Sequence, residues 1–180
     1  MRSNHDCIIT SSTTIIKDDP KLTCRIDGLI NRSPARIVLD NKLRISKNSN
    51  IVKDATKYRT IIFYNKDNYK KIKLLKKMNI KLYKISLNNN LNLNLRKTLI
   101  KAKQLGFHRI FLECGAKLSK SFLENKYVDE LHLFISNKKL KNDGQSNIKN
   151  YFKLFLKNKN KKIDEKINLF GEKLITYKLI

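Results

Sequence analysis

The sequence predicts an α/β fold, with a mostly parallel sheet, helices on both faces and a C-terminal pair of antiparallel strands. Short apolar runs, typical of buried strands, alternate along the chain with amphipathic segments of helical period. The 180 residues are 41% hydrophobic, which is enough for the core of one domain. We therefore expect a single domain over residues 1–180.

The expected strands are short segments whose middles are rich in Ile, Val, Leu and Phe. They cover residues 5–10, 35–40, 60–64, 80–85, 109–115 and 128–135. Near the C-terminus, residues 166–170 and 173–179 are expected to pair around Gly171. The polar segment 138–150 is expected to be a loop.

The expected helices lie between these strands. Residues 12–17 form a brief helical turn that ends before Pro20, because proline disfavours a helical conformation in the residue before it. Apolar residues three or four apart predict helices over residues 69–78 and from residue 95 onward, and Gly106 can end the latter. A further helix is expected over residues 116–125.

The net charge of +25, from 40 Lys and Arg against 15 Asp and Glu, suggests a nucleic-acid partner. However, lysines occur along the whole chain, and the densest cluster, residues 157–162, has no interleaved aromatic residue or glycine. A lysine-rich codon bias explains this pattern better. We expect no nucleic acid, and a basic RNA- or DNA-binding module stays as the alternative.

The cysteines and histidines do not indicate a metal site or disulfides. The three cysteines are odd in number and form no C-x-x-C pair, and the three histidines are scattered. No apolar run reaches the ~18 residues of a membrane helix. We expect a cytoplasmic protein with no metal and no membrane contact.

Candidate site residues follow three of the expected strands. The first strand leads into Ser and Thr residues at 10–14, the second into Asp40 and Asn41, and the fifth into Glu113, Cys114 and Gly115. In parallel sheets, ligands bind beyond the carboxyl ends of the strands. Gly115 and the free N–H groups of the following helix start suit a phosphate, although the glycine could also serve only a tight turn.

Charged residues after the first helix allow two interpretations each. Asp18 and Asp19 could be paired acid–base carboxylates or part of an aspartate-rich turn before Pro20. Arg25 could bind a phosphate or lie on the surface. The fingerprints of Rossmann, P-loop and zinc deaminase proteins are absent, and no catalytic triad is favoured by spacing.

Taken together, these segments resemble the reductase domains of the bacterial RibD family of riboflavin biosynthesis. The resemblance is carried by TSSTT at 10–14, DDP at 18–20, LT at 22–23, Arg25, RIVLD at 36–40, ECG at 113–115, SFL at 121–123, VDEL at 128–131 and FG at 170–171. The motifs occur in the same order over nearly the whole chain, which is more specific than any one of them.

This resemblance implies a dihydrofolate-reductase-like fold and NADPH-dependent reduction of 5-amino-6-(5-phosphoribosylamino)uracil to its ribitylamino product. Dimers are usual in the family, so a homodimer is implied. A relative that reduces another pterin or pyrimidine is the alternative, because a fold does not fix the substrate.

The resemblance also implies site residues. Asp18 is the candidate catalytic residue. The cofactor would be contacted by Thr14, Asp18, Asn41, Gly115, Ala116, Lys117, Leu118, Ser119, Lys120 and Ser121. The substrate would be contacted by Arg2, Leu22, Arg25 and Glu113, with Arg2 and Arg25 suited to its phosphate. The family commonly has serine at the position of Asn41, and glycine or alanine at that of Cys114.

The family's reductase domain begins with a strand and a turn containing glycine and tryptophan, before the residues that open this sequence. This sequence has no tryptophan, and it starts at Met1-Arg2-Ser3, in the middle of what should be a helix. We expect that Met1 is internal to a longer reading frame, and an in-frame stop codon directly upstream would contradict this. We also expect that the isolated chain has little activity and tends to aggregate, because a central strand is missing.

Overall fold

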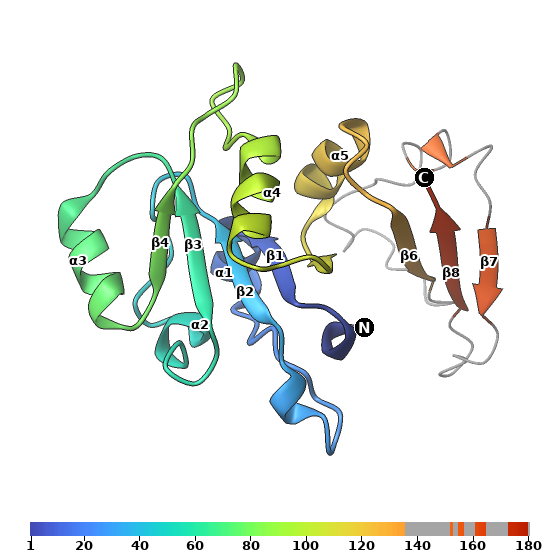
Figure 1. Ribbon diagram of the computed structural model, residues 1–180, viewed down its shortest axis with the longest axis horizontal. Helices are drawn as coiled ribbons and strands as arrows, with labels where there is room; N and C mark the ends of the chain where they lie inside the picture. Colours follow the sequence, from blue (N-terminus) through green and yellow to red (C-terminus); the bar gives the residue numbers. More distant parts are fainter. Residues whose placement is uncertain (136–151, 153–154, 157–160, 165–172, 180) are drawn as a thin grey trace. The chain divides into compact units, whose positions relative to one another are not determined.

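The computed structural model describes residues 1–135, 152, 155–156, 161–164 and 173–179 of the chain (Figure 1). Its contacts divide the chain into two compact units, residues 1–115 and residues 116–180. The first unit carries a parallel sheet and the second an antiparallel one.

The sheet of the first unit has five parallel strands in the order β4-β3-β2-β1-β5. The strands are β1 (Cys7–Ser11), β2 (Ala35–Leu39), β3 (Thr60–Tyr64), β4 (Lys81–Lys84) and β5 (Ile110–Leu112). Each of these strands overlaps a predicted strand, and all of the pairs are parallel, so the predicted parallel sheet is confirmed. All residues of β2 are buried, as expected for a strand covered on both faces.

Helices connect these strands, as expected for parallel pairs. They are α1 (Ser12–Asp18), α2 (Asn50–Lys53), α3 (Tyr69–Lys77) and α4 (Leu95–Gln104), with short 3₁₀ turns at Arg2–Asn4 and Ile30–Arg32. Ser11 caps α1 by accepting a hydrogen bond from the Thr14 N–H. Gly106 follows α4 with a φ of 89°, so the predicted glycine stop is confirmed.

One hydrophobic cluster packs against one face of the sheet. It joins strand residues such as Ile8, Val38 and Ile62 to Ile15 of α1 and Leu75 of α3. In a strand, neighbouring side chains point to opposite faces, so Ile9, Ile37 and Ile61 belong to the other face. Figure 1 shows α4 in front of the sheet, consistent with helices on both faces.

The second unit contains α5 (Ala116–Glu124) and an antiparallel sheet in the order β6-β8-β7. Its strands are β6 (Glu130–Ile135), β7 (Lys161–Asp164) and β8 (Lys173–Lys178). The predicted strand at 173–179 is confirmed, but it pairs with β6 and β7, so the antiparallel element has more strands than the predicted pair. The predicted strand 166–170 and loop 138–150 lie outside the described residues.

Within the part of the chain that the structure describes, no helix has the length and apolarity needed to cross a membrane.

Asp6 directly precedes β1, and its carboxylate binds the chain at the start of β5. Its carboxylate accepts hydrogen bonds from the N–H groups of Arg109 at 2.7 Å and His108 at 2.8 Å. The N–H groups of Arg109 and then His108 lower the pKa of this carboxyl below its ordinary value of 3.8, because both stabilise the ionised form.

This pKa predicts how stability depends on pH. A carboxyl whose pKa is lowered by folding adds stability above its unfolded-state pKa, and that contribution is lost as the pH falls through the folded-state pKa. We expect Asp6→Asn to lower the urea midpoint at pH 7, and the difference from the parent to vanish well below pH 3.8. Asp27→Asn, at an exposed position, is the control, and a pH-independent difference for Asp6→Asn would contradict the assignment.

Candidate active site

The sheet register brings the predicted strand ends together. β1 lies between β2 and β5, with Ser11 opposite Leu39 and Ile9 opposite Leu112. The carboxyl ends of these strands therefore share one edge of the sheet. The predicted site residues directly follow β1, β2 and β5, and the ends of these three strands are neighbours in the first unit.

The Ser and Thr residues after β1 lie beside an arginine that sequence reasoning did not single out. The Ser11 hydroxyl is 3.1 Å from that of Thr14, and Arg44 donates to the Ser12 hydroxyl at 3.0 Å. Arg44 Nε also lies 4.0 Å from the carboxylate of buried Asp40, and the Arg44 side chain is 55% exposed, so part of it can reach a ligand. An isolated arginine after Asp40 belongs to no motif, so only the fold could reveal its place.

Asp40 and Asn41 follow β2 and differ in their surroundings. The Asp40 side chain is fully buried, and it accepts a hydrogen bond from the Ile45 N–H at 2.9 Å. Asn41 donates to the Leu91 carbonyl at 3.2 Å, while its own side-chain oxygen is buried without a hydrogen-bond partner in the described part of the chain. Such unsatisfied polar atoms are uncommon in folded proteins.

Arg2 and Glu113, both predicted to bind substrate, form a bidentate ion pair. Arg2 Nε and Nη2 donate to the two Glu113 carboxylate oxygens at 3.0 and 2.7 Å. Arg2 Nη1 donates to the Thr23 carbonyl at 2.8 Å. The hydrogen bond to Glu113 raises the pKa of Arg2. These bonds bring together the N-terminal turn, the end of β5 and the segment that contains Leu22 and Arg25.

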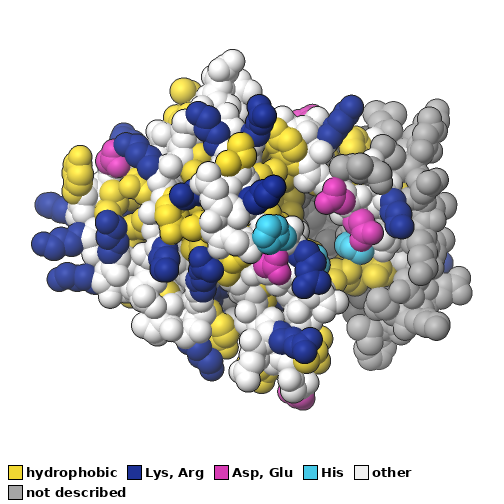
Figure 2. Space-filling view, viewed as in Figure 1, with side chains coloured by type: hydrophobic (Ala, Val, Ile, Leu, Met, Phe, Trp, Pro, Cys, Tyr) yellow, Lys and Arg dark blue, Asp and Glu magenta, His cyan; other side chains and the backbone are white. Residues whose placement is uncertain are grey.

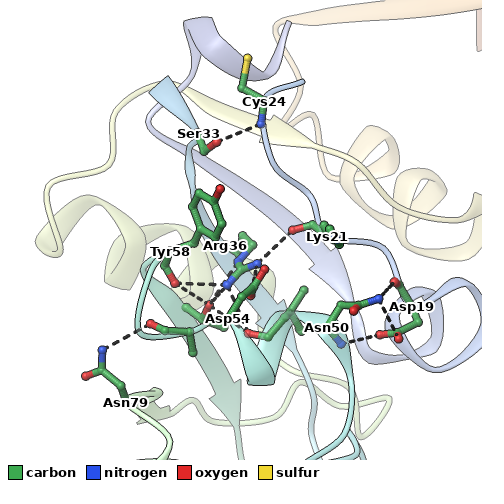
Figure 3. Close-up of polar contacts among 12 residues, drawn as sticks. Asp19, Lys21, Cys24, Ser33, Arg36, Asn50, Asp54, Tyr58 and Asn79 are labelled. Atoms are coloured by element: carbon green, nitrogen blue, oxygen red, sulfur yellow. Dashed lines mark hydrogen bonds and ion pairs between the residues drawn. The ribbon is translucent and has the colours of Figure 1, made fainter. Parts of the chain in front are cut away.

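The neighbouring carboxylates of Asp18 and Asp19 have different environments. The Asp19 carboxylate accepts from the backbone N–H of Asn50 at 2.8 Å and from its side-chain amide at 2.9 Å (Figure 3). Asp19 thus satisfies an N–H at the start of α2. Asp18 is exposed, and no described side chain bonds its carboxylate. Asp19 therefore has a structural environment, and Asp18 is the one available to a ligand.

Leu22 and Arg25 lie in the chain between α1 and β2. The Leu22 side chain is 1% exposed and packs in the hydrophobic cluster, and its φ of 54° is unusual for a residue other than glycine. Arg25 is exposed, and within the described chain no carboxylate pairs with it. Leu22 thus anchors this segment, whereas the Arg25 guanidinium faces solvent.

The remaining predicted cofactor residues belong to the second unit, apart from Gly115, which is the last residue of the first. Ala116, Lys117, Leu118, Ser119, Lys120 and Ser121 all lie in α5. A Cβ added at Gly115 would meet no described atom within 4 Å, and its φ is not positive. Neither packing nor a left-handed turn therefore requires a glycine at this position.

Among the described residues, no group of three or more His, Cys, Asp or Glu could hold a metal ion. Burial raises the pKa of the Cys7 thiol to about 12, so this cysteine is protonated at neutral pH.

A sequence profile of the RibD C-terminal domain matches residues 1–164, and the chain belongs to this family. It is 28% identical over 137 residues to the riboflavin biosynthesis protein RibD of Actinobacillus pleuropneumoniae, a match that covers 76% of this chain and 36% of that protein. The chain thus spans about a third of the length of such RibD relatives.

A second relative is of similar size. The 5-amino-6-(5-phosphoribosylamino)uracil reductase of Buchnera aphidicola is 26% identical over 168 residues, which cover 87% of this chain and 78% of that protein. Among solved structures, the riboflavin biosynthesis reductase Rib7 of Saccharomyces cerevisiae matches 99% of this chain and 77% of its own, with a TM-score of 0.74 and 18% identity. The structural match supports the predicted reductase fold.

The different environments of Asp18 and Asp19 predict different effects on stability. Asp19→Ala removes the acceptor at the start of α2 and should lower the free energy of unfolding by about 1 kcal/mol. Asp18→Ala, at an exposed position, should change it by less than about 0.5 kcal/mol. Urea denaturation at pH 7 measures both, and equal losses in the two variants would contradict the structural assignment.

Proposed function

We propose that the chain is an NADPH-dependent reductase that converts 5-amino-6-(5-phosphoribosylamino)uracil to its ribitylamino product in riboflavin biosynthesis. The family match over residues 1–164 is the main support. The Buchnera relative named for this reaction aligns with most of the chain. The gathering of the predicted strand ends at one edge of the sheet is independent structural support.

The residues present suit a pyridine dinucleotide. Thr14 and Asp18 are four residues apart on α1 and therefore share a helix face, while buried Ile15 packs in the core. Hydroxyls and amides can bind the ribose and phosphate oxygens. We propose that Thr14, Asp18 and Asn41 of the first unit contact the cofactor. For Gly115 and for residues 116–121 of α5, a cofactor contact is proposed from the resemblance to the family alone.

Arg44 favours NADPH over NADH as the cofactor. Its guanidinium donates to the hydroxyl of Ser12, the residue that follows β1, and its side chain is partly exposed. The 2′-phosphate of NADPH is the group that distinguishes the two cofactors, and guanidinium groups bind phosphates through bidentate charge-assisted hydrogen bonds. We therefore assign Arg44 to this phosphate.

The substrate phosphate suits Arg25 better than Arg2. Arg2 is bound to Glu113 and to the Thr23 carbonyl, whereas Arg25 is exposed. Arg2 then orients the Glu113 carboxylate, which can accept hydrogen bonds from the pyrimidine or the sugar. Leu22 contributes by fixing the backbone, because its side chain is in the core.

In the proposed mechanism the side chains bind and align the two reactants and assist one proton transfer. NADPH, when bound, supplies the hydride that reduces the sugar carbon attached to the amine. Arg25 and Glu113 hold the substrate, and the alignment they impose provides much of the acceleration. The bond from this carbon to the ring oxygen breaks as the new C–H bond forms, so the ring oxygen becomes a hydroxyl and needs a proton, which Asp18 is assigned to position or relay.

The alternative of a basic nucleic-acid module is supported only by the net charge of +25. Figure 2 shows Lys and Arg side chains distributed over the visible face of the first unit, with apolar and neutral atoms between them. A binding surface for nucleic acid would concentrate these charges. Salt-sensitive binding of random oligonucleotides without any NADPH binding would favour this alternative.

The proposal includes a cytoplasmic homodimer. Cys7 and Cys24 are buried thiols, which suits a reducing compartment. The dimer follows from the resemblance to the family, and sedimentation of the purified protein tests it.

The assignment of Asp18 predicts a loss of turnover. Asp18→Asn should lower kcat by about a hundredfold, because the carboxylate that positions or relays the proton is removed. The Kd for NADPH should change by less than about threefold, since the amide keeps the shape of the side chain. Asp27→Asn, at another exposed position, is the control. Unchanged turnover in Asp18→Asn would remove this residue from the mechanism.

The assignment of Arg44 predicts a change in cofactor preference. Arg44→Gln should raise the Kd for NADPH by about tenfold, because a charge-assisted hydrogen bond is lost, and should leave the Kd for NADH nearly unchanged. Isothermal titration with each cofactor measures both constants. Arg32→Gln, an exposed arginine in the 3₁₀ turn before β2, is the control. An equal loss for NADPH and NADH would contradict the assignment.

A further inference from the structure

Residues 19–25, here called the connecting segment, link α1 to the chain that leads into β2. They form no helix or strand, although they contain Leu22 and Arg25 and follow directly after Asp18. In the proposed site these residues must keep fixed positions. Since regular secondary structure does not hold the connecting segment, other bonds must do so.

The connecting segment is bonded at several points along its length. Its first residue, Asp19, is bonded to Asn50, and the Cys24 N–H donates to the Ser33 hydroxyl at 3.0 Å (Figure 3). Between these two points, the Lys21 carbonyl accepts from Arg36 Nη1 at 3.0 Å, and the Thr23 carbonyl accepts from Arg2 Nη1 at 2.8 Å. Figure 3 shows the Arg36 side chain between the connecting segment and the strands.

Arg36 lies on β2 and is fully buried. Its Nε and Nη2 donate to the Thr60 hydroxyl at 3.1 and 2.6 Å, and Nη2 also lies 3.2 Å from the carbonyls of Ile51 and Tyr58. The guanidinium carbon lies 5.4 Å from the centre of the Tyr58 ring. One planar group thus joins β2 to the end of α2 and to the start of β3.

The charge of Arg36 is balanced by Asp54, whose carboxylate lies 2.7 Å from Nη1. Burial lowers the pKa of Arg36, and the interaction with Asp54 offsets only part of this effect. An arginine keeps its charge in proteins even so. A buried charge costs much less when it is paired and hydrogen-bonded, so the geometry around Arg36 is strongly determined.

Lysine cannot reproduce this arrangement. Its single ammonium has three donors at one point, whereas the guanidinium spreads five donors over a plane. A lysine at position 36 could keep the ion pair with Asp54, but it could not at the same time reach Thr60 and the Lys21 carbonyl with the same geometry.

We propose that Arg36 is a positioning residue for the proposed reductase site: by binding the Lys21 carbonyl, it fixes the backbone of the connecting segment. Arg36 touches neither substrate nor cofactor in this role. It acts through the segment that carries Leu22 and Arg25 and begins next to Asp18. The catalytic part of this inference rests on the proposed function.

The test compares Arg36→Lys and Asp54→Asn with Phe63→Leu, which also disturbs the core. Phe63 is fully buried, but it lies outside the hydrophobic cluster that contains Leu22. Hydrogen exchange of the amides in residues 19–25 is measured by mass spectrometry on each protein. NADPH binding and kcat/KM for the pyrimidine substrate are measured on the same samples, well below the midpoint of thermal unfolding.

We expect Arg36→Lys to speed exchange in the connecting segment by about tenfold, because a local opening becomes easier. It should lower kcat/KM for the substrate by about tenfold or more, since small misplacements are costly in catalysis. The Kd for NADPH should change less than about threefold. Phe63→Leu should leave both exchange in this segment and kcat/KM within about twofold, and Asp54→Asn should resemble Arg36→Lys in direction.

Unchanged exchange in residues 19–25 of Arg36→Lys, or an equal increase in Phe63→Leu, would overturn the proposal. Faster exchange with unchanged kcat/KM would also overturn it, because the connecting segment would then not position the substrate. If the parent protein does not oxidise NADPH with the substrate, the proposed function fails. The exchange data still decide whether Arg36 holds the segment, so the two failures are distinguishable.

Discussion

The buried guanidinium of Arg36 is the constraint on which the rest of the first unit most depends. It binds backbone or side-chain oxygens of the connecting segment, α2 and the chain entering β3, while Asp54 balances its charge. The bonded oxygen atoms of Lys21 and Ile51 are thirty positions apart in the sequence, so Arg36 joins distant parts of the chain. A charge buried in this way is stable only when its bonding partners are in place, so the local structure forms cooperatively.

The parallel register provides the second constraint. Because β1 pairs with both β2 and β5, backbone pairing brings the ends of these strands together. The ion pair of Arg2 with Glu113 then joins the end of β5 to the N-terminal turn and to the connecting segment. The proposed substrate residues of the first unit are therefore linked through bonds rather than merely near each other.

Much of this fold could be predicted from the sequence, because buried strands and amphipathic helices have strong periodic signals. The strand Thr60–Tyr64 has the predicted bounds, and Gly106 marks the end of α4 as expected. The one-turn helix α2 was missed because four residues are too short to show a period. The strand β7 was missed because its sequence begins with two lysines and continues a basic run.

The candidate site was less predictable than the fold. The residue pattern alone did not separate Asp18 from Asp19, and the resemblance to the family singled out Asp18. The structure adds that Asp19 is bonded to Asn50, thirty-one positions away in the sequence, which no local pattern could indicate. Arg36 is part of the quoted RIVLD motif, but its role could not be inferred from the sequence. The role of a charged residue in a buried strand can be inferred only when its bonding partners from other segments are known.

The most direct test of the account follows the hydride itself. The purified protein is incubated with 5-amino-6-(5-phosphoribosylamino)uracil and NADPH deuterated at the nicotinamide C4, and the pyrimidine product is analysed by mass spectrometry. The account predicts oxidation of NADPH in step with a ribitylamino product that carries deuterium on the carbon attached to the amine. Product formed without deuterium, or NADPH that remains reduced while the substrate is bound, would contradict it.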